Sequence, residues 1–181
     1  MAKLALGRRR TSAPTWPSHI HDALVERGIR QVCYVPDAGH ARLIGLCQKN
    51  RAMRTVSLTT EEEGVAHLAG AWLGGDAGVL LMQSSGVGNC INMLSLVSEG
   101  RFPLLMLVTM RGDWGEANPW QVPMGQGTQT ALENADVIVY RADRADDVAD
   151  TVSAAARLAF ASTRAVAVLI GQRVIGTKVF R

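Results

Sequence analysis

Two uninterrupted apolar runs, GVLLM at 78–82 and PLLMLVTM at 103–110, constrain the fold of this chain most strongly. Runs of this length are typical of strands buried on both faces, as in parallel sheets. Four further β-rich runs alternate with helical patterns: QVCYV at 31–35, TVSL at 55–58, DVIVY at 136–140 and AVAVLI at 165–170. Each connection is long enough for a crossover, so we predict an α/β fold in one domain, with a six-stranded doubly wound parallel sheet and helices on both faces.

The segments between these runs carry weaker signals. Helical spacing predicts a first helix from about Ser18 to Gly28 and a late one over residues 144–160. The small residues from Gln83 to Asn89 predict a turn in which the backbone can approach another group closely. Residues 111–127, rich in Gly and Pro, are expected to form a long loop, and loops of that length are commonly functional.

Charge and cysteine content exclude several classes of protein. The net charge is only +3, and its one basic cluster, Arg8–Arg10, lies in residues 1–16, which we expect to form an N-terminal arm ahead of a domain at 17–181. No basic or aromatic stripe continues the cluster, so no nucleic-acid partner is expected. Three cysteines without CxxC spacing indicate reduced thiols in the cytoplasm. No apolar run reaches the roughly 18 to 20 residues of a membrane span.

The segment TTEEEGVAHLAGAW at 59–72 is the most informative for function. Thr59 or Thr60 can cap a helix whose first turn holds three glutamates, and Val65, Leu68, Ala69 and Trp72 follow on one face. The carboxylates therefore lie at the exposed end of a buried helix, after a short strand, where open α/β sheets bind ligands. The alternative is that the three glutamates only favour the helix N-terminus electrostatically.

Known nucleotide and metal motifs are not found. Neither GxxxxGK[ST] nor GxGxxG occurs, and His19 and His21 point to different faces of their helix. We therefore expect no metal site held by this chain alone.

Four separated pieces together resemble one family: VPDAGHARLI at 35–44, TTEEEGVAHLAGAW at 59–72, MQSSGVGNCINML at 82–94, and PLLMLVTMRGDWGE with QVPMGQG between 103 and 127. The chain resembles, over residues 17–171, the pyrimidine-binding domain of thiamine-diphosphate-dependent decarboxylases, and most of all the sulfopyruvate and phosphonopyruvate decarboxylases. The resemblance implies that fold for the domain. It also implies decarboxylation of a 2-oxo acid, with the bound cofactor as electron sink.

The resemblance selects Glu62 as the catalytic carboxylate, because the family's glutamate precedes an alanine by seven positions and an aromatic residue by ten, which fits Ala69 and Trp72. Glu61 and Glu63 each miss this spacing by one position, in opposite directions. The family's glutamate binds the ring nitrogen of the cofactor's aminopyrimidine. A carboxylate in a dry site can share a proton with that ring.

Other residues are assigned by the same analogy. Cofactor contacts are expected from Glu62, Pro36, Gln83, Gly86 and Asn89, and substrate contacts from Asp37, His40, Gln83, Ser84 and Arg111. Arg111 and His40 are the candidate cationic contacts for an anionic substrate. Purely structural alternatives exist: Asp37 caps the helix after Pro36, and Asn89 fixes a turn. Ala38 and Met82 stand where a serine and a histidine are common in relatives, which disfavours aryl substrates.

The family's second domain has no counterpart here. Full-length members carry a diphosphate-binding domain with a GDG motif and paired asparagines that hold Mg²⁺, and this chain has neither. The chain therefore resembles the α subunit of a split enzyme, with thiamine diphosphate shared with a β subunit that holds the diphosphate and Mg²⁺, in an α2β2 or larger hetero-oligomer. Two alternatives remain: a non-catalytic binding or regulatory module of the same fold, and half of a carboligating enzyme of the acetolactate synthase or transketolase kind.

Overall fold

The computed structural model describes residues 15–177 of the chain. The arm expected at residues 1–16 lies almost wholly outside the described residues. The strands are β1 (Gln31–Tyr34), β2 (Arg54–Ser57), β3 (Gly78–Gln83), β4 (Leu104–Thr109), β5 (Ile138–Ala142) and β6 (Ala165–Ile170). They form one six-stranded sheet in the order β2-β1-β3-β4-β6-β5, and every neighbouring pair is parallel. The predicted fold is confirmed.

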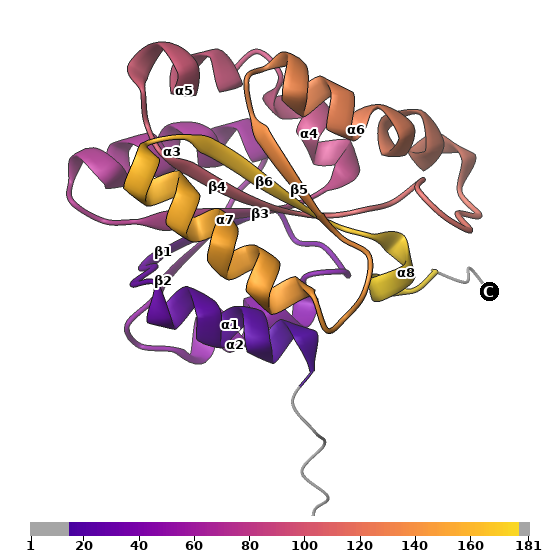
Figure 1. The fold of residues 1–181 in the computed structure, drawn as a ribbon, viewed down its shortest axis with the longest axis horizontal. Helices are drawn as coiled ribbons and strands as arrows, with labels where there is room; N and C mark the ends of the chain where they lie inside the picture. The colour runs from indigo at the N-terminus through magenta and orange to yellow at the C-terminus, as the bar shows by residue number, and fades with distance from the viewer. Residues whose placement is uncertain (1–14, 178–181) are drawn as a thin grey trace, which may run out of the picture.

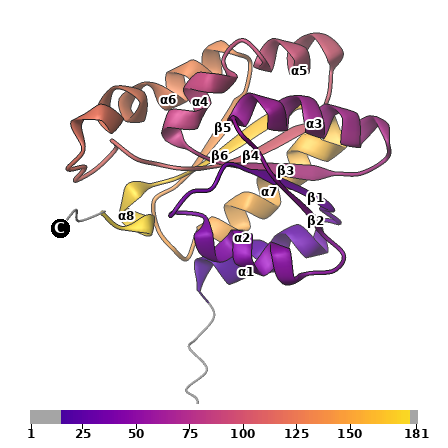
Figure 2. The same ribbon diagram turned by 180° about the vertical axis from the view of Figure 1, so that it is seen from behind.

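Helices cover both faces of this sheet (Figures 1 and 2). On one face lie α1 (Trp16–Glu26), α2 (Ala41–Lys49) and α7 (Val148–Ser162), and on the other α3 (Glu61–Leu73), α4 (Ser84–Cys90), α5 (Leu94–Gly100) and α6 (Val122–Asn134). Short helical turns, η1 (Pro119–Gln121) and α8 (Gln172–Ile175), lie in loops beyond β4 and β6. None of the helices within residues 15–177 is long and apolar enough to cross a membrane.

The core has two layers because side chains of a strand alternate between the faces of the sheet. In β3, Val79 and Leu81 pack on the α1–α2–α7 side, whereas Leu80 and Met82 pack on the α3–α6 side. The central strand β4 is buried over its whole length, which agrees with its unbroken apolar run. Burial on both faces therefore explains the absence of polar alternation in these sequences.

Two local predictions were wrong. The segment after Gln83 is the helix α4 and not a turn, and the loop after β4 is shorter than expected, since α6 begins at Val122. The Asn118 side chain accepts a hydrogen bond from the Trp120 amide (3.1 Å), and the next residue, Pro119, opens η1. Pro123 then lies in the first turn of α6, where proline favours helix initiation. Proline here marks the start of helices and not a loop.

Candidate functional site

The candidate site lies at the carboxyl ends of β1 and β3. These strands are neighbours, but the chain leaves β1 toward α2 on one face and β3 toward α4 on the other. Such a divergence opens a crevice where parallel α/β sheets bind ligands. The predicted site residues Pro36 and Asp37 follow β1, while Gln83 ends β3 and Ser84 begins α4. The fold thus brings most of the predicted residues to one edge of the sheet.

The three consecutive glutamates at the start of α3 have three different environments. Glu61 is buried, with 8% of its surface exposed, whereas Glu62 and Glu63 are exposed. Glu63 folds back on Thr59, accepting hydrogen bonds from its amide (3.0 Å) and its hydroxyl (2.6 Å). These bonds lower the pKa of Glu63. Glu63 is therefore a capping residue, and the Thr60 side chain makes no cap hydrogen bond.

Glu62, the predicted catalytic carboxylate, is exposed at the start of α3, where a partner chain can reach it. Successive helical residues point about 100° apart, so only one of the three can face the sheet at this helix end. That residue is Glu61, which is buried against α4. The spacing to an alanine and an aromatic residue favours Glu62, and its exposure in the single chain is compatible with a site that another chain completes.

Two residues of α4 hold the Glu61 carboxylate. Asn89 Nδ2 donates a hydrogen bond to Glu61 Oε2 (2.8 Å). Gly86, one turn earlier, lies against the same side chain, and a Cβ there would come within 2.7 Å of Glu61 Cγ. The other oxygen, Oε1, is the atom nearest to that Cβ position. The carboxylate is thus held between Asn89 and the backbone of α4 at Gly86, and it ties the start of α3 to α4.

Asp37 caps the start of α2, which is the structural role given above as the alternative to a substrate contact. Its Oδ2 accepts hydrogen bonds from the amides of Gly39 (3.1 Å) and His40 (3.3 Å), just before α2. The same oxygen also accepts the hydroxyl of Thr109 at the end of β4 (2.7 Å). Asp37 therefore links the ends of β1 and β4, and it remains half-buried at the crevice.

His40 is not available as a substrate contact. Its ring is 1% exposed and its Nε2 lies 3.0 Å from the carbonyl oxygen of Leu107. Burial lowers the pKa of His40, although the charge of Asp37 opposes the shift. The neutral ring, with Nε2 as donor, is therefore a packing element between α2 and the sheet.

Ser84 and Arg111 also use their polar groups internally. The Ser84 hydroxyl donates to the Arg111 carbonyl and accepts from the Arg111 amide, both at 2.9 Å. The Arg111 guanidinium makes a bidentate ion pair with Glu116. This carboxylate neutralises the cation that was expected to meet an anionic substrate. The geometry argues against direct substrate contacts from His40, Ser84 and Arg111.

Gln83 lies at the crevice with its amide shared between two partners. Its Nε2 donates to Ser85 Oγ (2.6 Å) and to Gln121 Oε1 (3.3 Å) in η1. It is half-buried, and Pro36 is exposed on the neighbouring strand end. Both remain candidates for contacts with a ligand. Within the described part of the chain, no three His, Cys, Asp or Glu residues are grouped so as to hold a metal ion.

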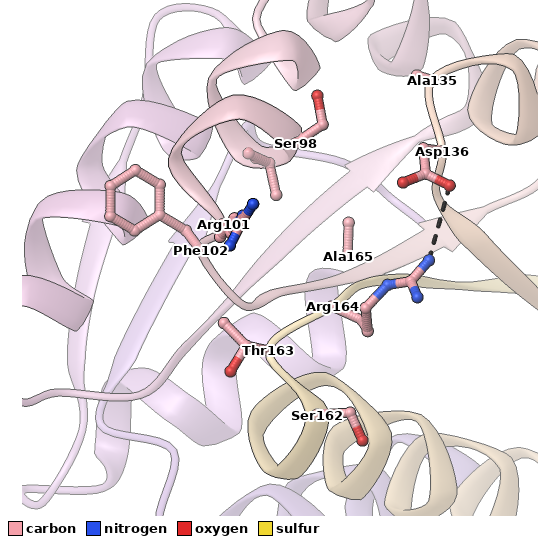
Figure 3. Close-up of a pocket in the computed structure, with 10 residues that line it drawn as sticks. Ser98, Arg101, Phe102, Ala135, Asp136, Ser162, Thr163, Arg164 and Ala165 are labelled. Atoms are coloured by element: carbon pink, nitrogen blue, oxygen red, sulfur yellow. Dashed lines mark ion pairs between the residues drawn. The ribbon is translucent and has the colours of Figure 1, made fainter.

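The best-defined hollow outside the crevice lies at the opposite edge of the sheet (Figure 3). It has a volume of about 470 Å³ and lies where α5, α6 and α7 end, with Arg164 Nη2 3.6 Å from Asp136 Oδ1 on its rim. Its lining includes none of the residues near Glu61. A hollow found by shape alone therefore does not identify the candidate site.

Three residues that support the site were not predicted: Thr109, Glu116 and Gln172. Gln172 is fully buried, accepts hydrogen bonds from the amides of Asp113 and Trp114 (both 3.0 Å), and donates to Glu116 (2.9 Å). Thr109 ends β4 and Gln172 closely follows β6, and this position at the end of a buried strand was a usable signal, whereas Glu116 lies farther along the loop after β4. Their hydrogen-bond partners are mostly distant in the sequence, so the spacing of residues along the chain could not predict these contacts.

The chain is similar to known proteins over most of its length. The family described as "Thiamine pyrophosphate enzyme, N-terminal TPP binding domain" matches residues 15–137. The sulfopyruvate decarboxylase subunit alpha of Methanococcus maripaludis is 32% identical over 152 residues, covering 83% of this chain and 91% of the relative. That of Methanocaldococcus jannaschii is 35% identical over 123 residues, covering 67% of this chain and 73% of the relative.

Longer proteins match over part of their length. The phosphonopyruvate decarboxylase of Streptomyces viridochromogenes is 38% identical over 112 residues, which cover 61% of this chain and 28% of that protein. A solved structure of 2-oxoglutarate:ferredoxin oxidoreductase from Magnetococcus marinus superimposes with a TM-score of 0.74 at 13% identity, covering 90% of this chain and 29% of the other. At that identity the likeness concerns the fold alone.

Proposed function

Because this chain belongs to the thiamine pyrophosphate enzyme family, through its N-terminal TPP-binding domain, we propose that it is the α subunit of a two-subunit thiamine-diphosphate-dependent 2-oxo acid decarboxylase. Two curated α subunits match it over most of their own length, which supports an enzyme divided between two chains. The alternatives of a regulatory module and a carboligating half have no specific observation in their favour.

The observation that carries the proposal is Glu62, exposed at the start of α3 while its neighbour Glu61 is anchored on α4 by Asn89 and Gly86. Glu62 stands seven residues before Ala69 and ten before Trp72, the spacing of the family's glutamate. When bound, thiamine diphosphate supplies an electron sink for the carbon–carbon bond that breaks as CO₂ leaves. The role of Glu62 is to accept a hydrogen bond from, or share a proton with, a ring nitrogen of the aminopyrimidine.

The partner is a β subunit that holds the diphosphate and its Mg²⁺. The sequence contains no GDG motif, and the described residues offer no group of metal ligands. Mg²⁺ sites use oxygen ligands together with substrate phosphates, and such a set fits the other chain. We propose an α2β2 or larger assembly in which Glu62 faces the β subunit. Three buried free thiols suit a reducing compartment, so we place the complex in the cytoplasm.

The proposed substrate is a 3-substituted pyruvate such as sulfopyruvate or phosphonopyruvate. The names of the relatives support this class. Arg111 is already neutralised by Glu116, so this chain offers the anionic substituent little charge at that position. Relative decarboxylation rates of sulfopyruvate, phosphonopyruvate and pyruvate by the reconstituted complex test the class. Equal kcat/KM for all three would reject recognition of an anionic substituent.

The test of the proposed function compares two neighbouring glutamates in the complex of both subunits. Glu62→Gln keeps the shape of the side chain but removes the carboxylate, so decarboxylase turnover should fall by about 100-fold or more. Glu63→Gln is the matched control, because Glu63 folds back on Thr59, and it should retain turnover within about twofold. Size-exclusion chromatography should show both variants assembled with the partner. Wild-type turnover in the assembled Glu62→Gln complex would reject the proposal.

A further inference from the structure

A second hollow, of about 500 Å³, lies at the carboxyl ends of β5 and β6. The loops after β4, β5 and β6 border it, and the function proposed above uses none of its residues. The chain leaves β4 toward α6 and β5 toward α7, on opposite faces of the sheet, with β6 between them. Open α/β sheets bind ligands at such divergences. The lining side chains are Asp113, Trp114, Arg141, Asp143, Arg144 and Arg173.

Both carboxylates of the lining bind the same arginine, Arg141. Arg141 Nη2 donates a hydrogen bond to Asp113 Oδ2 (2.6 Å), and Arg141 Nε donates one to Asp143 Oδ2 (2.8 Å). Asp113 Oδ2 also accepts the amide of Gln172 (3.3 Å), which ties this group to the loop after β6. The ionised groups of this wall therefore satisfy one another. The cations left for a ligand are Arg144 and Arg173.

Arg173 stacks on the indole of Trp114, with its guanidinium carbon 4.9 Å from the ring centroid. The Trp114 amide donates to Gln172 Oε1 (3.0 Å), so the backbone that carries the indole is fixed. Stacking uses the face of a guanidinium and leaves the N–H groups at its edge available. Among residues 15–177, no carboxylate forms an ion pair with Arg173. A guanidinium held by its face and open at its edge suits a bidentate contact with phosphate.

Arg144 supplies the second cation, from the loop after β5. It lies 3.7 Å from an oxygen of Asp147 and 3.9 Å from one of Asp146, and all three side chains are mostly exposed. Exposed ion pairs of this kind contribute little, so a ligand anion can replace them. The two aspartates compete with that anion, and removing one of them should therefore strengthen binding.

We infer that this hollow binds a phosphorylated small molecule with a flat ring, such as a nucleotide, through the guanidiniums of Arg144 and Arg173 and the indole of Trp114. A volume of about 500 Å³ is typical of sites for small organic ligands and is large for an inorganic ion. Trp114 is 48% exposed, and nucleobases stack on such aromatic side chains. The inference does not depend on decarboxylation, because it uses different residues.

The test titrates the full chain with ADP, with inorganic phosphate and with adenosine. Calorimetry gives each dissociation constant, and the indole N–H signal of Trp114 in a ¹H–¹⁵N NMR spectrum locates the bound molecule. Arg173→Gln and Arg144→Gln each remove one cation. Arg157→Gln is the matched control, because Arg157 is an exposed arginine of α7 outside the lining.

We expect ADP to shift the Trp114 signal and to bind at least about 10-fold more tightly than inorganic phosphate, because only ADP also stacks. Arg173→Gln and Arg144→Gln should each weaken ADP binding by about 10-fold or more, the effect of a lost hydrogen bond to a charged group. Arg157→Gln should change it by less than about twofold. Asp147→Asn should strengthen it, since this change removes a competitor for Arg144.

Three results would overturn the inference. An unchanged Trp114 signal at millimolar ADP would mean that the hollow holds no nucleotide. Equal weakening by Arg157→Gln and Arg173→Gln would mean that ADP is attracted by the net positive charge of the chain and not by this site. Adenosine or inorganic phosphate binding as tightly as ADP would exclude joint recognition of ring and phosphate. None of these measurements involves decarboxylation, so such a failure would leave the proposed function intact.

Discussion

The guanidinium of Arg111 and the carboxylate of Glu116 form two parallel hydrogen bonds, Nε to Oε2 at 2.6 Å and Nη2 to Oε1 at 2.7 Å. Their side chains are only 10% and 2% exposed. Glu116 also accepts from the amides of Gly112 and Asn118 and from Gln172 Nε2. This pair is therefore the centre of the loop after β4, and it fixes the backbone that leads from the sheet to η1 and α6.

Breaking this pair should destabilise the protein strongly. Glu116→Gln leaves the Arg111 charge buried without its counter-ion, and we expect the free energy of unfolding to fall by about 3 kcal/mol. Asp146→Asn is the control, because Arg144 and Asp146 are both exposed and 3.9 Å apart. That change should cost less than about 0.5 kcal/mol. Urea denaturation measures both, and equal values would contradict the role assigned to Glu116.

The same pair predicts loss of stability in acid. Hydrogen bonds from Arg111 hold the pKa of Glu116 well below its ordinary value. The unfolded chain takes up this proton near pH ~4.3 and the folded chain only at lower pH. Protons therefore favour unfolding, and the stability that Glu116 contributes above its ordinary pKa is lost as the pH falls below about 4. Urea denaturation between pH 6 and pH 3 should give a shallower decline for Glu116→Gln than for the wild type, and parallel curves would exclude this linkage.

His40 predicts a second, separate pH dependence. Burial lowers the pKa of its ring, whereas the unfolded chain protonates it near pH ~6.5. The unfolded state therefore binds more protons below that pH, and stability should decline as the pH falls from about 6.5 to 5. His40→Gln can keep a donor to the Leu107 carbonyl but cannot titrate, so it should lose this decline while retaining the acid loss due to Glu116. If His40→Gln left the pH dependence of the free energy of unfolding unchanged, both between about pH 6.5 and 5 and at lower pH, the decline would come from another titrating group.

Gly86→Ala should separate stability from activity. Alanine favours a helix interior over glycine by about 1 kcal/mol, and the three atoms nearest to the new methyl group all belong to the Glu61 side chain. We expect a thermal midpoint near that of the wild type, but about 100-fold lower turnover in the complex, because displacement of Glu61 moves the start of α3, which carries Glu62. Gly88→Ala meets only Met124, with Sδ at 3.5 Å and Cγ at 3.7 Å, and is the matched control. Equal turnover in the two variants would show that the contact between Gly86 and Glu61 is not critical.

The sequence by itself determined the α/β class and the six parallel strands, and it predicts the candidate site at their carboxyl ends. The apolar runs in β3 and β4 are long and unbroken, and this pattern depends only on burial of consecutive residues. Sequence-based prediction was less reliable for proline and small residues, because these residues occur both in turns and at the starts of helices. Pro119, Pro123 and the stretch after Gln83 start helices here, although the same residues are common in turns.

Only the tertiary structure decided which glutamate is buried and which polar groups are already occupied. Glu61, Glu62 and Glu63 are chemically the same, and α3 must be placed against α4 before one of them faces Asn89. Likewise, the sequence does not show that the Arg111 cation is paired. Only the folded chain places Glu116 against it, with Gln172 bonded to Glu116. Spacing along a chain determines which residues share a face of a helix or strand. It cannot specify the partner of a side chain, because that partner comes from another element of the packed fold.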